Sequence, residues 1–199
     1  MSSPFRTGLP VETAGSPAEL LASWLPANDD PLRPLMTLST VSASGYPDAR
    51  SVLLSEYDAA GLSFHTDSRS RKAADLTANP RVALTLVWPG RQLVVQGDAA
   101  PVGAEERARA YAQRSRYLQL LAWLNTPELA TLPLPERRAR WAAFAAEHPE
   151  GSLTPPPTWV GYRVRPVRLT FWEGDAEAAS RRTEFTRRGD DWSAAVLAG

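Results

Sequence analysis

The chain has 199 residues, of which 22 are basic and 22 acidic, so no net charge favours binding to nucleic acid or to an anionic membrane. It contains no cysteine, which excludes disulfides, thiolate metal sites and a cysteine nucleophile, and its two histidines lie too far apart in the sequence to predict a metal site. No apolar run approaches the roughly 20 residues of a membrane span, and the first residues lack an apolar signal core. We therefore expect a cytoplasmic protein that binds neither nucleic acid nor membrane.

The first 16 residues are rich in proline, glycine, serine and threonine, which is typical of a flexible arm. Ser16 and Pro17 then suit the start of a short helix, with Glu19 completing the capping pattern. Residues 26–34 are a proline-rich linker before a strand at 35–42. We divide the chain into an N-terminal arm with a short helix (1–30) and one domain (31–199).

The stretch 48–81 contains a short buried strand at 50–54, a turn at 57–61 and a second strand at 62–66. Asp58 and Gly61 are turn residues. A helix begins near Arg71, with N-cap residues just before it, and Asn79-Pro80 ends it.

The start of this helix has the composition of an anion site. Helix N-termini present unpaired N–H groups and a partial positive charge, and Arg71 and Lys72 add two full charges there. Arg50, Thr66 and Ser70 can reach the same point. A phosphate would satisfy all these groups; the alternative is a solvated basic helix start.

Downstream, strands are predicted at 81–88 and 91–97 around the Pro89-Gly90 turn, and helices at 104–116, 118–124 and 136–147. Further strands are predicted at 159–164, 167–173, 182–187 and 191–197. Many short strands joined by hairpins and interrupted by helices predict an antiparallel barrel with helices packed outside, in a mainly β protein.

Several ordered motifs resemble the pyridoxamine 5'-phosphate oxidase family. They are Arg50-Ser51-Val52-Leu53-Leu54, His65-Thr66, Ser70-Arg71-Lys72-Ala73, Asn79-Pro80-Arg81, Arg91-Gln92 and Thr170-Phe171-Trp172-Glu173, at matching spacing. The resemblance runs from about residue 31 to the C-terminus, including a family-like C-terminal segment at 159–199. It implies a Greek-key split β-barrel that forms a homodimer, with flavin mononucleotide (FMN) at the subunit interface.

The same resemblance assigns residues to the cofactor. The implied FMN-binding set is Arg50, Ser51, Val52, Leu53, His65, Thr66, Ser70, Arg71, Lys72, Gln92, Trp172 and Arg182. Arg182 would lie near the flavin ring, where a guanidinium can stabilise the negative charge of the reduced ring, so it is also the predicted catalytic residue. Without the resemblance, Trp172 suits core packing, and Gln92 and Arg182 suit a solvent-facing strand.

The substrate positions differ from the family pattern. Ser55 stands where the family has a lysine, and Ala178 and Ser180 stand where it has arginine and histidine. Arg114 is retained at a substrate-phosphate position, with Arg116 beside it. We take Ser55, Arg114, Arg116 and Ser180 as predicted substrate contacts; the alternative for the two arginines is a solvated helix face.

The sequence therefore predicts an FMN-dependent oxidase that acts on a small anionic ring substrate other than pyridoxamine phosphate. Three alternatives remain open: a genuine pyridoxamine or pyridoxine 5'-phosphate oxidase, an oxidase like those of phenazine pathways, and a non-catalytic protein that binds flavin or deazaflavin. Heme is disfavoured because His65 and His148 are the only histidines that could serve as axial ligands.

Overall fold

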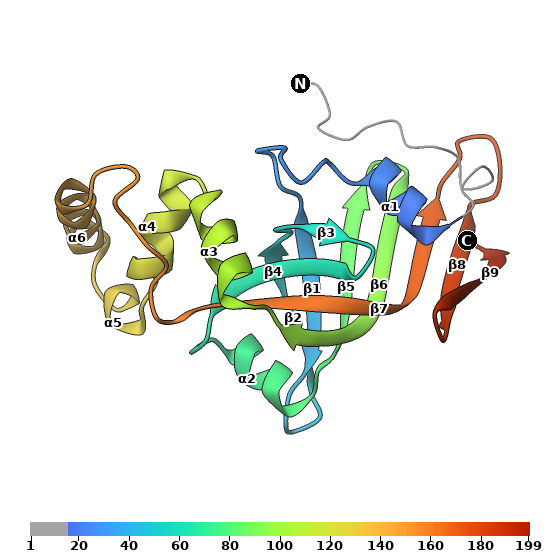
Figure 1. Cartoon of the computed structure of the whole chain (residues 1–199), viewed down its shortest axis with the longest axis horizontal. Helices are drawn as coiled ribbons and strands as arrows, with labels where there is room; N and C mark the ends of the chain where they lie inside the picture. The colour runs from blue at the N-terminus through green and yellow to red at the C-terminus, as the bar shows by residue number, and fades with distance from the viewer. Residues whose placement is uncertain (1–15) are drawn as a thin grey trace.

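The computed structural model describes residues 16–199 and shows a mainly antiparallel β protein with helices around it (Figure 1). The predicted arm lies almost wholly outside the described residues. The strands are Leu35–Val41 (β1), Pro47–Leu53 (β2), Tyr57–Asp58 (β3), Gly61–Asp67 (β4), Arg81–Trp88 (β5), Arg91–Pro101 (β6), Trp159–Glu173 (β7), Arg181–Arg188 (β8) and Asp191–Ala198 (β9). The helices are Pro17–Trp24 (α1), Arg71–Ala78 (α2), Ala104–Ala112 (α3), Arg116–Leu124 (α4), Pro127–Ala130 (α5) and Leu134–Glu147 (α6).

The strands form one antiparallel sheet in the order β2-β1-β5-β6-β7-β4-β3, and β8 and β9 continue outward from β7. Backbone bonds close the sheet: the N–H of Ser55, just after β2, donates to the carbonyl of Ser63 on β4 at 2.8 Å. The return bond runs from the N–H of Ser63 to the carbonyl of Glu56, also at 2.8 Å. These bonds join β4 to the chain leaving β2, and the predicted split-barrel fold class is confirmed.

The barrel interior is filled by alternate residues of its strands, with Leu38, Leu84 and Val95 fully buried in one row across β1, β5 and β6. Alternation of this kind is what a strand with one core-facing side produces. Helix α1 covers the core at one end. Its Trp24 packs edge-on against Phe171, with ring centroids 5.1 Å apart, and so extends the core beyond the strands.

The two strands predicted at 159–164 and 167–173 are one continuous strand, β7. Pro166 lies between the two predicted ranges, and proline cannot donate to a β-ladder. The structure accommodates it at an irregularity, where the register between β6 and β7 shifts at Gln96/Gly97 and Pro166 lies opposite Gly97. A bulge is one of the few places inside a sheet where proline is tolerated.

The helical segment also differs from the prediction at its first boundary. The helix predicted at 104–116 ends at Ala112, and α4 begins at Arg116 after Ser115, whose side chain accepts a hydrogen bond from the N–H of Leu118. Helices α3 to α6 lie on one side of the barrel, and the β8–β9 hairpin lies on the other (Figure 1). Within residues 16–199, no helix is long and apolar enough to cross a bilayer.

Candidate functional site

The turn before β4 and the start of α2 lead to the predicted phosphate site, and both follow from the local sequence. The carboxylate of Asp58 accepts from the N–H groups of Ala60 and Gly61 at 2.8 and 3.1 Å, and Gly61 has a φ of 148°, as this turn requires. After β4, Ser70 is the N-cap of α2, but its side chain makes no capping bond. Its hydroxyl instead lies 3.5 Å from that of Thr66. The helix start is thus left with an uncapped first turn.

Arg50 reaches this helix from β2. Its Nη2 lies 2.7 Å from Asp48 Oδ2 and 3.4 Å from Oδ2 of the buried Asp75 on α2, and its Nη1 donates to the hydroxyl of Thr40 at 2.7 Å. Arg71, whose side chain is 80% exposed, lies 3.4 Å from the same Asp48 oxygen. Two guanidinium groups from different elements therefore meet at one carboxylate oxygen.

Lys72 joins the hydroxyl groups to this cluster. Its Nζ donates to Thr66 Oγ1 at 3.1 Å, and it forms no ion pair with a carboxylate of residues 16–199. Burial, and then the charge of Arg50, lower the pKa of Lys72. An anion placed between the two cations would favour the charged form of Lys72 and so raise its pKa again. We call Arg50, Thr66, Ser70, Arg71 and Lys72 the cation cluster.

The other predicted residues of β2 lie beside this cluster but offer less to a ligand. Ser51 is exposed, Val52 is buried in the core, and Leu53 is half-buried. Val52 can therefore contribute only its backbone to a bound molecule. Contacts from these three residues stay predictions.

The residues predicted to contact the flavin ring form a row on three neighbouring strands. Gln92 on β6 pairs with Trp172 on β7, and Trp172 pairs with Arg182 on β8. Directly paired residues of an antiparallel sheet project from the same face. We call these three residues the ring row.

The cation cluster and the ring row begin on opposite faces of the sheet. Arg50 pairs with Leu38, which is fully buried, so Arg50 belongs to the inner face at the barrel end. Gln92 precedes the fully buried Leu93 and pairs with Val87, which is 70% exposed, so the ring row belongs to the outer face. Strands β1 and β5 also separate the two sets.

A separate cavity of about 270 Å³ lies beside Ser55, and Arg114 is on its wall. Arg114 Nη2 donates to Ser55 Oγ at 2.7 Å, and burial lowers the pKa of Arg114 to about 10, which leaves it protonated at neutral pH. The residues around the cavity are Asn28, Asp29, Asp30, Pro31, Arg33, Ser55, Ala110, Gln113 and Arg114.

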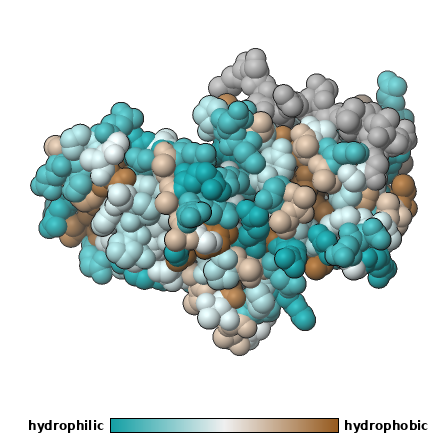
Figure 2. Space-filling model, viewed as in Figure 1, coloured by the Kyte–Doolittle hydropathy of each residue, from teal (hydrophilic) through white to brown (hydrophobic). Residues whose placement is uncertain are grey.

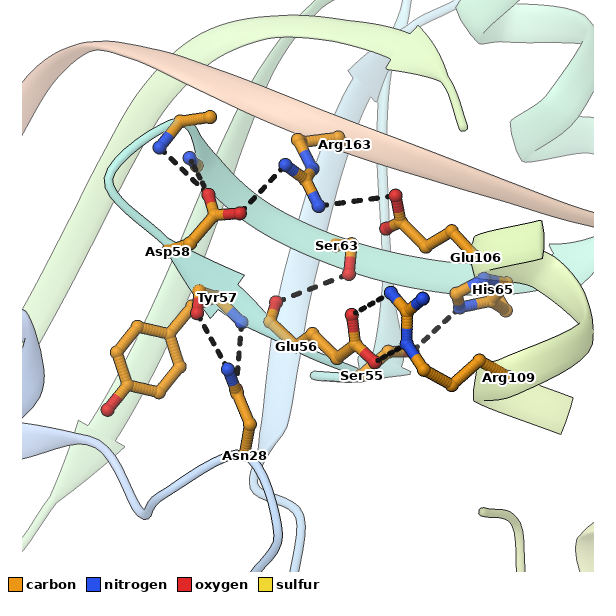
Figure 3. Close-up of polar contacts among 12 residues, drawn as sticks. Asn28, Ser55, Glu56, Tyr57, Asp58, Ser63, His65, Glu106, Arg109 and Arg163 are labelled. Carbon is orange, nitrogen blue, oxygen red and sulfur yellow. Dashed lines mark hydrogen bonds and ion pairs between the residues drawn. The ribbon is translucent and has the colours of Figure 1, made fainter. Parts of the chain in front are cut away.

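His65 belongs to this cavity region, since its ring bonds to Ser55 (Figure 3). Ser55 Oγ accepts from Arg114 and also shares a hydrogen bond with His65 Nδ1, 2.8 Å away, in which the donor depends on the imidazole tautomer. The ring stacks on Trp159 at 5.3 Å. Burial, and then the charge of Arg114, lower the pKa of His65 to about 4, so the ring is neutral at pH 7.

Ion pairs fix helix α3 over this region (Figure 3). Arg109 of α3 pairs with Glu56 at 3.0 Å, and Glu106 of α3 accepts from Arg163 of β7 at 3.2 Å. Arg163 also pairs with Asp58 at 2.9 Å. These contacts position the helix that carries Ala110 at the cavity wall.

Two of the predicted substrate residues lie outside the cavity lining. Arg116 donates through Nη2 to the carbonyls of Ala145 and His148 at the C-terminal end of α6, an arrangement that stabilises a helix end. Ser180 lies just before β8, where its carbonyl accepts from the N–H of Gly199. That Arg116 and Ser180 contact the substrate stays a prediction, and their positions outside the cavity lining do not favour it.

Three residues with clear roles in this geometry were missed from the sequence. Asp48 and Asp75 supply the negative charge in the cation cluster, and Trp159 forms the wall behind His65. Asp48 could have been found, because it lies two residues before Arg50 on the same side of a strand. The position of Trp159 depends on strand pairing and had no local signal.

Comparison with known proteins identifies the family. The family model described as pyridoxamine 5'-phosphate oxidase matches residues 31–148, and one described as the pyridoxine 5'-phosphate oxidase C-terminal dimerisation region matches residues 159–198. The chain belongs to the pyridoxamine 5'-phosphate oxidase family. The resemblance inferred from the motifs is thereby confirmed.

Relatives and solved structures agree with this assignment. A pyridoxine/pyridoxamine 5'-phosphate oxidase of Caulobacter vibrioides is 35% identical over 92% of this chain and 85% of its own length, and one of Streptomyces avermitilis is 39% identical over 78% and 70%. PhzG from Burkholderia lata, solved with tetrahydrophenazine-1-carboxylic acid, is 28% identical with a TM-score of 0.75 and coverage of 83% and 82%. An FMN-binding protein from Nostoc punctiforme, 20% identical with a TM-score of 0.70 and coverage of 83% and 88%, shares the fold.

Proposed function

We propose that this protein is an FMN-dependent oxidase of a small anionic ring substrate other than pyridoxamine phosphate. The observation that carries the proposal is the convergence of Arg50 and Arg71 on one point, with Lys72 and the hydroxyls of Thr66 and Ser70 beside it. Charged donors and hydroxyls beside an uncapped helix start suit a phosphate, which accepts several hydrogen bonds at once. The donors present thus fit the phosphate end of FMN.

The ring row supports the other half of the cofactor site. Gln92 can donate to the polar edge of a flavin, Trp172 offers an aromatic surface, and Arg182 supplies a positive charge for the reduced ring. When bound, FMN would supply the redox chemistry by accepting a hydride from the organic substrate, and oxygen would then serve as oxidant. The protein's own part is to bind, orient and tune, which accounts for the absence of a nucleophile constellation among the described residues.

The arrangement on two faces supports a shared site. One chain presents its cation cluster from the inner face and its ring row from the outer face of the same sheet. A single nucleotide that meets both sets would lie between two copies, with the phosphate held by one and the ring by the other. The match of residues 159–198, which carry Trp172 and Arg182, to a dimerisation region supports the same homodimer.

The substrate part of the proposal is supported by the cavity. Ser55 and Arg114 line it, so it offers a fixed positive charge and a hydroxyl rather than a set of bidentate contacts. The fold neighbour PhzG was solved with a ring carboxylic acid, a substrate type that such a cavity suits. His65 is neutral at pH 7 and bonded to Ser55, so its role is to orient that hydroxyl toward Arg114.

The absorption spectrum of the purified protein tests the cofactor. We expect the two bands of oxidised flavin, either as isolated or after addition of FMN and gel filtration. A protein that stays colourless after such loading contradicts the proposal. Anaerobic mixing with partly reduced aromatic carboxylic acids should bleach the bands, and admission of oxygen should restore them; a loaded protein that no substrate bleaches would be a flavin-binding protein without this activity.

A genuine pyridoxamine 5'-phosphate oxidase is the second candidate. The names of relatives at 35–39% identity favour it, and so does Arg114, which the resemblance places at a substrate-phosphate position. Steady-state oxidation of pyridoxamine 5'-phosphate, compared with ring carboxylates at equal concentration, separates the two. Higher kcat/KM for the phosphate ester would establish the second candidate.

A further inference from the structure

Arg33 is a second arginine on the cavity wall, and it comes from the linker between α1 and β1. Its Nε donates to the carbonyl of Leu54 at 3.3 Å, and its Nη1 donates to the carbonyl of Ala27 at 2.6 Å. Its Nη2 is buried and has no partner among the described residues. Two nitrogens therefore hold the guanidinium in place while the third is left unsatisfied.

Arg33 and Arg114 form an uncompensated pair of like charges. Neither makes an ion pair with a carboxylate of residues 16–199. Burial lowers the pKa of both, and the charge of Arg33 further lowers that of Arg114. Asp29 and Asp30 also line the cavity, but their attraction does not offset the burial of Arg33. Desolvated like charges are costly unless something of opposite sign joins them.

We propose that Arg33 is a specificity-determining residue, and that Arg33 and Arg114 together hold the anionic group of the substrate, a carboxylate or a phosphate. The inference rests on the proposed function in taking this cavity as the substrate site. The Nε of Arg33 is anchored to the carbonyl directly before Ser55, so the linker supplies a cation next to a position that has only a hydroxyl. Both guanidinium groups are oriented before binding, which lowers the entropy cost of capturing the anion.

The size and charge of the cavity narrow the substrate class. About 270 Å³ suits the anion-bearing end of a small molecule, with the rest of the ring outside the cavity. Among the described residues, Arg33 and Arg114 are the only cations of the cavity lining, and Asp29 and Asp30 on the same wall would repel a second anionic group. The site therefore suits a substrate with one anionic group.

Isothermal titration of the purified full chain with benzoate and with inorganic phosphate tests this inference, with neutral benzamide as the reference ligand. We expect at least one anion to bind more tightly than benzamide, and Arg33→Gln to weaken that binding roughly tenfold or more. The relative affinities of benzoate and phosphate identify the anionic group. Wild-type protein that binds neither anion, or Arg33→Gln protein that binds within about twofold of wild type, overturns the inference.

Two further variants test whether a loss of anion binding in Arg33→Gln comes from misfolding or from removing any half-buried arginine. Arg33→Met removes the charge but keeps an unbranched side chain, so we expect a loss of affinity like that of Arg33→Gln; an unchanged affinity would overturn the inference even if Arg33→Gln fails to fold. Arg168→Gln removes a half-buried arginine of β7, which pairs with Glu184 outside the cavity lining, and should bind the anion like wild type. Flavin content, measured on the same samples, reports on the proposed function separately, because the cation cluster shares no residue with the cavity.

Discussion

The cation cluster and the substrate cavity both gather positive charge, but they neutralise it differently. In the cation cluster, Arg50 and Arg71 already share Asp48, and Arg50 also reaches Asp75. In the cavity, Arg33 and Arg114 have hydroxyl or carbonyl partners and no carboxylate at ion-pair distance among the described residues. The cluster is thus an ordered site with carboxylates that a ligand must compete with, whereas the cavity keeps its charge unpaired.

The difference indicates two kinds of ligand binding. A cofactor that stays bound can tolerate internal carboxylates, because many contacts add up. A substrate that enters and leaves must find the charge available.

The largest effect is expected from Arg71→Ala combined with Lys72→Ala. Hydrogen bonds to charged groups contribute roughly 1.5–3 kcal/mol each, so loss of two should weaken FMN binding by about 100-fold or more. Fluorescence titration of the apoprotein with FMN measures this. Arg69→Ala is the matched control, because Arg69 is adjacent but pairs with Asp67 outside the cluster. Full flavin occupancy in the double variant would show that the phosphate lies elsewhere.

The next effect concerns His65 and acid. Its pKa is lowered from 6.5 to about 4 on folding, so the unfolded chain binds the proton more readily. Stability should therefore fall as the pH drops from about 6.5 towards 4, by at most roughly 3 kcal/mol at about 1.4 kcal/mol per pKa unit. Urea unfolding at several pH values measures the slope, and His65→Phe should flatten it. An equal slope in both proteins would place the acid-sensitive group elsewhere.

A smaller loss is expected from Ser55→Ala. The change leaves Arg114 Nη2 and His65 Nδ1 without their shared hydroxyl, at a cost of roughly 1–3 kcal/mol in the free energy of unfolding. Ser63→Ala is the control, because the carbonyl that accepts from its hydroxyl also accepts its own N–H. If the two variants unfold at the same urea concentration, the bonds of Ser55 do not matter for stability.

The smallest effect is expected from Asp48→Asn. Neutralising this carboxylate frees Arg50 and Arg71 for a phosphate, and since exposed ion pairs are weak, FMN should bind up to about fivefold more tightly. Weaker FMN binding in the same titration would mean that Asp48 positions the two arginines instead of competing with the ligand.

The sequence predicted the parts that depend on neighbours along the chain. The turn at Asp58 and Gly61, the start of α2 and its basic residues all lie within 30 or so positions and follow from local rules. The division at residue 30, the cofactor roles of the ring row and the substrate roles stay predictions. The barrel class followed from the alternation of hydrophobic residues in successive strands.

The cavity could not be predicted in the same way. It brings together the linker that carries Arg33, the chain after β2 and the α3–α4 junction, which lie far apart in the sequence. Arg33 stands among prolines with no periodic pattern around it, and one of its partner carbonyls, that of Leu54, becomes a neighbour only when β2 pairs with β1. The continuity of β7 was missed for a related reason, since the residue that accommodates Pro166 lies on another strand.

The irregularity opposite Gly97 also sets the phase of β7. Before it, the inward side chains are at even positions, such as Val164; after it they are at odd positions, Leu169 and Phe171. Trp159 and Trp172 are thirteen residues apart, an odd separation that would turn regular-strand residues to opposite sides. The extra residue in β7 brings both tryptophans to the outer face of the sheet. Trp159 stacks on His65 there, and Trp172 lies beside Gln92. Straightening the irregularity without removing a residue would rotate the second half of the strand, exchanging Trp172 for Phe171 and dissolving the ring row although the sequence of the motif stayed the same.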